Sequence, residues 1–141
     1  MATHGLPAWP LIGQQADALP EAERLLLDAL RGWCAAGAAG PLGTAAIILA
    51  AGGVEALALP LDAALRELPG IEAAAPLGPQ VTGDEAAMLH AVAALQASRR
   101  SLALALLHRL APPLQAYRAL PALMGVACGL RRARLLLALT L

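Results

Sequence analysis

Residues 44–65, "TAAIILAAGGVEALALPLDAAL", decide the fold of this chain, because they admit three structural interpretations. They fit a membrane span, half of a DNA-binding helix-turn-helix, or two helices buried in an ordinary core. Gly52 and Gly53 divide the stretch, and glycine commonly ends a helix. Pro69 and Gly70 give a second stop signal further along. We therefore predict two core helices, at about residues 44–51 and 61–68.

The membrane interpretation depends on residues 32–54, the longest uncharged stretch of the chain. The stretch is long enough to cross a bilayer, which takes about 20 apolar residues. Insertion is driven by Leu, Ile, Phe and Val, and only five residues of these types occur here, while Pro41 breaks the helix. The N-terminal "MATHGLPAWPLIGQQ" also lacks the basic and long apolar segments of a secretory signal. The sequence predicts no membrane span and a cytoplasmic location.

The segment before this stretch is predicted to be an irregular N-terminal arm, residues 1–19, followed by an amphipathic helix of about 17 residues. Pro20 suits the first turn of that helix. Apolar residues recur at helical spacing on one face: Leu26, Leu27, Leu30, Trp33 and Cys34. The opposite face carries a charged stripe of Glu21, Arg24, Asp28 and Arg31. We expect this stripe to be solvated, because its members can pair one turn apart.

Residues 69–82, "PGIEAAAPLGPQVT", are predicted to form a long connection between two halves, residues 20–68 and 83–141, of one helical domain spanning residues 20–141. Thr82 and Glu85 then form a T-x-x-E capping box, the clearest helix start in the sequence. Two more helices are expected, one capped by Ser101 and one starting at Pro113. The final "LRRARLLLALTL", residues 130–141, fits either a last helix or an extended tail.

Residues 84–129 resemble the helical hairpins of tetratricopeptide-type scaffolds, with small residues such as Ala87, Ala94 and Ala103 that permit close helix approach. The 34-residue period of that family is missing. The resemblance implies only that neighbouring helices are mostly antiparallel. The fold class predicted from the whole pattern is all-α, a single-domain bundle of five to six helices.

Residues 44–68 also resemble the helix-turn-helix of bacterial repressor domains. The residues that carry this likeness are Ile47, Ala50, Gly53, Val54 and Leu59. A recognition helix must present polar side chains to base edges and phosphates. Between Glu55 and Arg66 the only charged residue is Asp62, and Pro60 lies within the expected recognition helix. A DNA-associated regulator with a degenerate helix-turn-helix is therefore kept only as a third hypothesis.

Composition excludes several kinds of chemistry. Ala and Leu make up 67 of the 141 residues, and Lys is absent, so the chain has neither a Schiff-base lysine nor a P-loop lysine. Ten arginines balance ten acidic residues, which gives no overall surplus of positive charge for a phosphate backbone. We predict no cofactor, no nucleic-acid partner and no enzymatic activity.

Four residues have side chains that are typical of zinc ligands: Cys34, Cys128, His90 and His108. Neither the C-x-x-C nor the H-x-x-x-H spacing of recognisable zinc sites occurs. Asp84 and Glu85 are adjacent carboxylates, but their place at a helix start predicts a capping role. No catalytic, metal or cofactor-binding residue is predicted.

Two hypotheses of different classes remain for the function. The leading one is a non-enzymatic helical protein-interaction module, self-associating or binding another protein through an apolar face. The predicted interface residues are Leu123, Met124, Leu135, Leu136 and Leu139, if the tail is helical; alternatively, these residues close the core of the monomer. The other hypothesis is a small binding protein for an apolar molecule. The predicted pocket mouth consists of His108, Arg109 and Tyr117.

Overall fold

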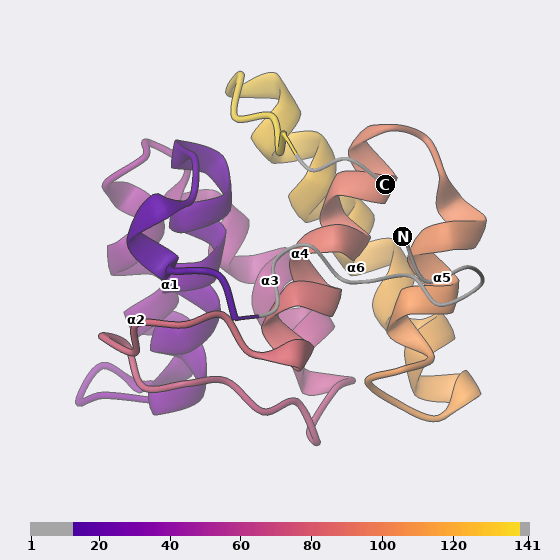
Figure 1. Ribbon diagram of the computed structural model, residues 1–141, viewed down its shortest axis with the longest axis horizontal. Helices are drawn as coiled ribbons and strands as arrows, with labels where there is room; N and C mark the ends of the chain where they lie inside the picture. The colour runs from indigo at the N-terminus through magenta and orange to yellow at the C-terminus, as the bar shows by residue number, and fades with distance from the viewer. Residues whose placement is uncertain (1–12, 139–141) are drawn as a thin grey trace.

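The computed structural model describes residues 13–138 and folds them into a helical bundle without a β-sheet (Figure 1). In chain order the elements are η1 (Ala16–Ala18), α1 (Glu21–Ala35), α2 (Gly40–Ala50), η2 (Glu55–Leu57), α3 (Ala58–Arg66), α4 (Gly83–Gln96), α5 (Arg100–Leu107) and α6 (Pro113–Arg132). The prediction of an all-α, single-domain bundle is confirmed, with six α-helices in the described part of the chain.

The two helices predicted within residues 44–68 are present, with earlier starts than expected. Helix α2 begins at Gly40 because Pro41, whose fixed φ suits a first turn, initiates the helix there. Helix α3 begins at Ala58, so Pro60 lies in its first turn, where the missing N–H costs little. Gly53, with a φ of +74°, makes the turn between them in a conformation that suits glycine.

Helix α4 is the central element of the bundle. Its capping box is formed as predicted: the Thr82 hydroxyl accepts from the Glu85 N–H, and the Glu85 carboxylate accepts from the Thr82 N–H. Ten of its 14 residues are buried, and it contacts α1, α5 and α6. A helix that is apolar on every side is expected at such a place.

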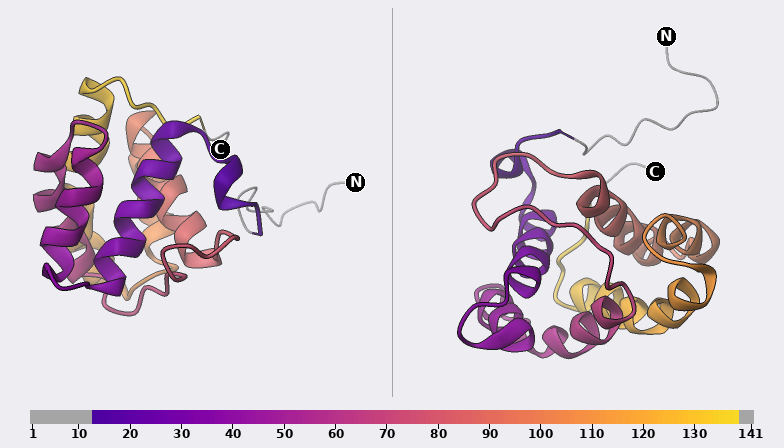
Figure 2. Two further views of the ribbon diagram at one scale, coloured as in Figure 1. Left: turned by 90° about the vertical axis from the view of Figure 1, so that its left-hand side faces the viewer. Right: turned by 90° about the horizontal axis from the view of Figure 1, so that it is seen from below.

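The bundle has two groups of helices that meet along its middle. Figure 1 shows α1 to α3 on one side and α4 to α6 on the other, with α3 packed on α6 and α1 on α4. Gly129 of α6 allows a close approach, because a Cβ there would collide with the Leu57 side chain. The connection between α3 and α4 passes across one face of the bundle (Figure 1), and Figure 2 shows the same arrangement from two further sides.

The N-terminal end of the described chain is attached to the connection by backbone hydrogen bonds, and the C-terminal end continues beyond α6 without a further helix. Residues 13–16 pair with the connection, since the Gly13 N–H donates to the Val81 carbonyl at 2.9 Å and the Val81 N–H donates to the Gln14 carbonyl at 3.0 Å. The rest of the predicted arm, residues 1–12, lies outside the described residues. After α6 ends at Arg132, the chain is non-helical through Ala138, so the extended alternative is the one found.

None of the helices between residues 13 and 138 has the length and apolar content needed to span a membrane.

Candidate interaction site

A buried ion pair joins the two groups of helices. Arg31, at the end of α1, donates from Nε to Glu85 Oε2 at 2.7 Å and from Nη2 to Glu85 Oε1 at 3.0 Å. The two side chains are 1% and 0% exposed. Arg31 also donates to the Gly78 and Gln80 carbonyls at 2.7 and 2.9 Å. The expectation that Arg31 belongs to a solvated stripe is wrong, because the connection covers that end of α1.

The Glu85 carboxylate is saturated with donors. Besides Arg31 it accepts from the Ala74 and Thr82 N–H groups, each at 2.9 Å. Burial alone would raise the pKa of Glu85, but the hydrogen bonds from Arg31 and the two backbone N–H groups, with the arginine charge, bring that pKa below its ordinary value. A carboxylate held in this way is ionised and fully hydrogen-bonded. It fixes the connection rather than offering a free base.

The remaining charged stripe of α1 matches the prediction. Arg24 pairs with Asp28 at 3.1 Å and with Asp17 of η1, and these side chains are partly or largely exposed.

Asp84, the residue before Glu85, accepts a hydrogen bond from the Glu72 N–H at 2.8 Å, which ties the connection to the start of α4. Glu85 therefore caps α4 as predicted, whereas the hydrogen bond of Asp84 goes to the connection and not to an N–H of the helix start.

The thiol and imidazole residues are placed apart. Cys34 is half-buried on α1, and burial together with the Glu85 charge raises the pKa of its thiol, whereas Cys128 is exposed on α6. His90 is buried inside α4, where burial lowers the pKa of its imidazole, and His108 is exposed after α5. Within residues 13–138, no three His, Cys, Asp or Glu side chains group as metal ligands would.

The predicted interface residues do not share one face. Leu123 is fully buried and Leu135 is 9% exposed, so both belong to the core of the monomer. Met124 is partly buried, and Leu136 is 59% exposed. The extended tail turns Leu135 and Leu136 to opposite sides, so the helical face proposed for them is not formed. Leu139 lies outside the described residues.

The tail is held in its extended form by Gln96, the last residue of α4. Its amide Nε2 donates to the Leu135 carbonyl at 3.0 Å, and its Oε1 accepts from the Leu137 N–H at 2.8 Å. The buried Glu23 of α1 accepts from the Ala138 N–H at 2.8 Å. The tail is therefore attached to both groups of helices. The sequence pattern does not reveal this attachment, because the bonds join side chains of the helices to backbone groups of the tail, which every residue type has.

One of the three residues predicted to form a pocket mouth lies at a groove. Tyr117 lines a groove of about 300 Å³ between α5 and α6. The other lining residues are Arg100, Ser101, Leu104, Leu120 and Pro121. His108 and Arg109 are exposed and are not among the residues that line it. The volume is at the lower end of the range of small-molecule pockets, about 300 to 1,000 Å³.

The least expected surface is the outer face of α2. This helix has no charged residue, and neither has any other position from 32 to 54. Only Ala45 and Leu49 of its 11 residues are buried, while Ile47 is 68% exposed. An apolar helix is expected to be enclosed, so the exposure of Ile47 marks an unpartnered face. The sequence prediction treated α2 as a core helix and missed this face.

Comparison with known proteins returned no matching family, no matching curated protein and no matching solved structure.

Proposed function

We propose that the chain is a non-enzymatic interaction module that pairs with a second copy of itself through the outer face of α2. One observation carries the proposal: a helix with no charged residue, at the edge of the bundle (Figure 2), leaves Ile47 68% exposed. Covering apolar surface is favourable by about 25 cal/mol per Å² before the costs of association.

The spacing of two residues favours a second copy over an unrelated partner. Gly43 lies one helical turn before Ile47, on the same side of α2 and opposite the buried Ala45. A Cβ built on Gly43 would lie 3.0 Å from the Ala39 Cβ, so the glycine lets Ala39 pack closely and leaves this side of α2 without a projecting side chain. In an antiparallel pair related by a two-fold axis, each Ile47 would lie on the flat surface at the partner's Gly43, as a self-complementary interface requires.

The size of the interface sets a further condition. A stable interface commonly buries about 800 Å² on each partner, which is roughly a tenth of the 7208 Å² exposed by the described chain. Helix α2 is too short to supply that area alone. The contact would extend to the exposed residues Ala39 and Ala51 that flank α2 and to Leu59 of α3, which is 65% exposed.

Sedimentation equilibrium of three proteins tests the proposal. The unmodified chain is expected to be dimeric at micromolar concentration, and Ile47→Glu is expected to be monomeric because it places a charge in the apolar contact. Leu77→Glu is the matched control: Leu77 is 92% exposed, on the connection, and its variant should remain dimeric. A single 14.3 kDa species for the unmodified chain would refute the proposal.

A second candidate function rests on the groove beside Tyr117. Its apolar lining, Leu104, Leu120 and Pro121, with Arg100 and Ser101 at its edge, suits a small amphipathic molecule. Native mass spectrometry distinguishes the two functions. A retained small molecule on a monomer favours the groove, and a ligand-free dimer favours α2.

A further inference from the structure

Charge is segregated along the chain although its total is zero. All ten acidic residues occur by position 85, together with three of the ten arginines, which gives residues 1–85 a formal net charge of −7. Residues 86–141 contain the other seven arginines and no Asp or Glu, a formal net charge of +7. The overall balance hides this asymmetry, which is a recognised sign of an anionic partner.

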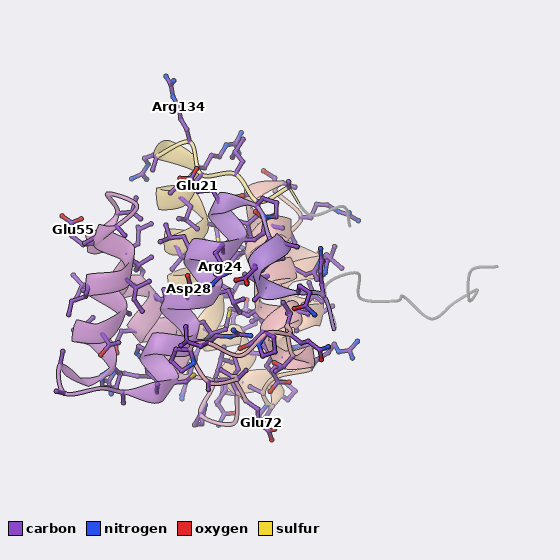
Figure 3. The ribbon with its side chains drawn as sticks, turned by 60° about the vertical axis from the view of Figure 1, so that its left-hand side comes forward. Glu21, Arg24, Asp28, Glu55, Glu72 and Arg134 are labelled. Atoms are coloured by element: carbon purple, nitrogen blue, oxygen red, sulfur yellow. The ribbon has the colours of Figure 1, made fainter. Side chains whose placement is uncertain are left out.

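The acidic half uses all three of its arginines in internal ion pairs, which engage four of its ten acidic side chains. Its three arginines are all ion-paired within that half: Arg24 with Asp17 and Asp28, Arg31 with Glu85, and Arg66 with Asp62. The exposed Glu21, Glu55 and Glu72 lie at separate places around the molecule (Figure 3). This half therefore does not gather its exposed glutamates into one acidic surface for the arginines of a second copy.

Several arginines of the other half gather where α4 and α6 end. Arg131 donates from Nη1 to the Gln96 carbonyl at 3.1 Å, and the Gln96 side chain binds the tail that follows. We define the arginine end as Arg99, Arg131, Arg132, Arg134 and Leu136, all of which are exposed. Figure 3 shows Arg134 projecting away from the bundle.

Around Arg131, Arg132 and Arg134 the chain is mostly aliphatic, although the exposed Ser98 precedes Arg99 and Gln96 lies beside Arg131. Residues 126–138 contain no Ser, Thr, Asn or Gln that would add contacts to bases or phosphates. They present Leu136 instead, 59% exposed between the inward-facing Leu135 and Leu137. Arginines with an exposed leucine suit a membrane surface, where the cations meet lipid phosphates and the leucine enters the interface. The same composition is a poor match to nucleic acid.

We propose that the arginine end docks the protein on an anionic membrane surface, without insertion of a helix. Each arginine near such a surface adds about fivefold to membrane partitioning, which corresponds to about 1 kcal/mol. The partitioning should fall steeply with salt, because exposed charges are screened over about 3 Å at 1 M ionic strength. This proposal does not depend on pairing through α2.

Co-flotation with lipid vesicles tests the proposal, using phosphatidylcholine alone and phosphatidylcholine with about one-third phosphatidylserine. Only the anionic vesicles should bring up the protein at low salt, and 1 M salt should release it. The double variant R132Q/R134Q should reduce partitioning about 25-fold, at about fivefold for each arginine. The matched control R109Q/R118Q removes the same charge from exposed positions outside the arginine end and should retain most of the binding.

Three outcomes would overturn the proposal. Equal losses in the two double variants would show that net charge acts without a defined surface. Flotation with neutral vesicles would show that charge is not the cause. Binding to a fluorescent oligonucleotide without binding to anionic vesicles would identify nucleic acid as the partner. The variant I47E should float like the unmodified chain, which separates this test from that of self-association, and circular dichroism verifies that each variant is folded.

Discussion

Helices α2 and α4 are both rich in Ala and aliphatic residues, but they are enclosed to different degrees. Neither has a continuous polar face, yet α4 buries ten of its 14 residues, whereas α2 buries two of its 11, leaves seven partly buried and exposes Ile47 and Ala50. A helix that is apolar on every side is stable when neighbours cover it on every side. Helix α4 has these neighbours within its own chain. We infer that α2 obtains one of them from a second copy.

The first prediction concerns the ion pair that fixes the start of α4. Arg31→Met would leave the Glu85 carboxylate buried without its counter-charge and should lower the free energy of unfolding by about 3 to 5 kcal/mol. Urea denaturation measures this loss. Arg66→Met is the control, because Arg66 is 65% exposed in its pair with Asp62, and an exposed pair contributes about 0 to 1 kcal/mol. Similar losses for the two variants would contradict the structural role of Arg31.

The second prediction compares the two helices directly. Leu89→Ala in α4 should cost about 2 to 5 kcal/mol, since Leu89 is 0% exposed and its truncation leaves a cavity. Ile47→Ala in α2 should change the stability of the monomer by well under about 1 kcal/mol, because its side chain is 68% exposed. Chemical denaturation at a concentration below dimerisation checks both. A large loss for Ile47→Ala there would mean that α2 is enclosed by its own chain.

The third prediction concerns the attachment of the tail to the end of α4. Gln96→Ala removes the side chain that donates to the Leu135 carbonyl and accepts from the Leu137 N–H. The free energy of unfolding should fall by about 1 to 3 kcal/mol, since the Leu137 N–H would lose its partner. Hydrogen exchange read by NMR should show the Leu137 amide losing protection, while the amides of α1 keep theirs. Unchanged protection at Leu137 would show that the tail is held in another way.

The fourth prediction is a pH dependence that originates inside α4. Burial lowers the pKa of His90 in the folded chain below its ordinary value of 6.5. The stability that this gives is fully present above about pH 6.5 and is lost as the pH falls through the lower folded pKa. The slope from one proton is at most about 1.4 kcal/mol per pH unit. Urea denaturation should show that the free energy of unfolding declines between pH 7.5 and pH 5.5. This decline should be smaller in His90→Leu and unchanged in His108→Gln, whose substitution is at an exposed position.

Local signals in the sequence predicted much of the fold. Three of these signals are found where expected: the capping box of Thr82 and Glu85, the turn at Gly53 after α2, and the start of α6 at Pro113. Each depends on residues that are close together in the chain. The helix expected after Ser101 is also present, although it begins at Arg100 and Ser101 does not cap it. These features depend on residues within one or two turns, so their pattern is visible without the tertiary structure.

The sites depend on long-range placement and were harder to predict. Arg31 meets Glu85 across 54 positions of sequence, and Glu23 meets Ala138 across 115. Spacing within a helix identifies the face on which a charge lies, but not what covers that face. The exposure of α2 could not be predicted for the same reason. An apolar sequence does not show how many other helices of the chain cover the helix that it forms.

Hydrogen–deuterium exchange at two protein concentrations tests the central claim most directly, because it reads α2 and α4 in the same sample. Helix α4 should be protected equally in dilute and concentrated solution, since its neighbours belong to the same chain. The amides of α2 should exchange more slowly in the concentrated sample and should lose that difference in Ile47→Glu. Exchange in α2 that does not change with concentration, in a folded protein at high micromolar concentration, would contradict pairing through this helix.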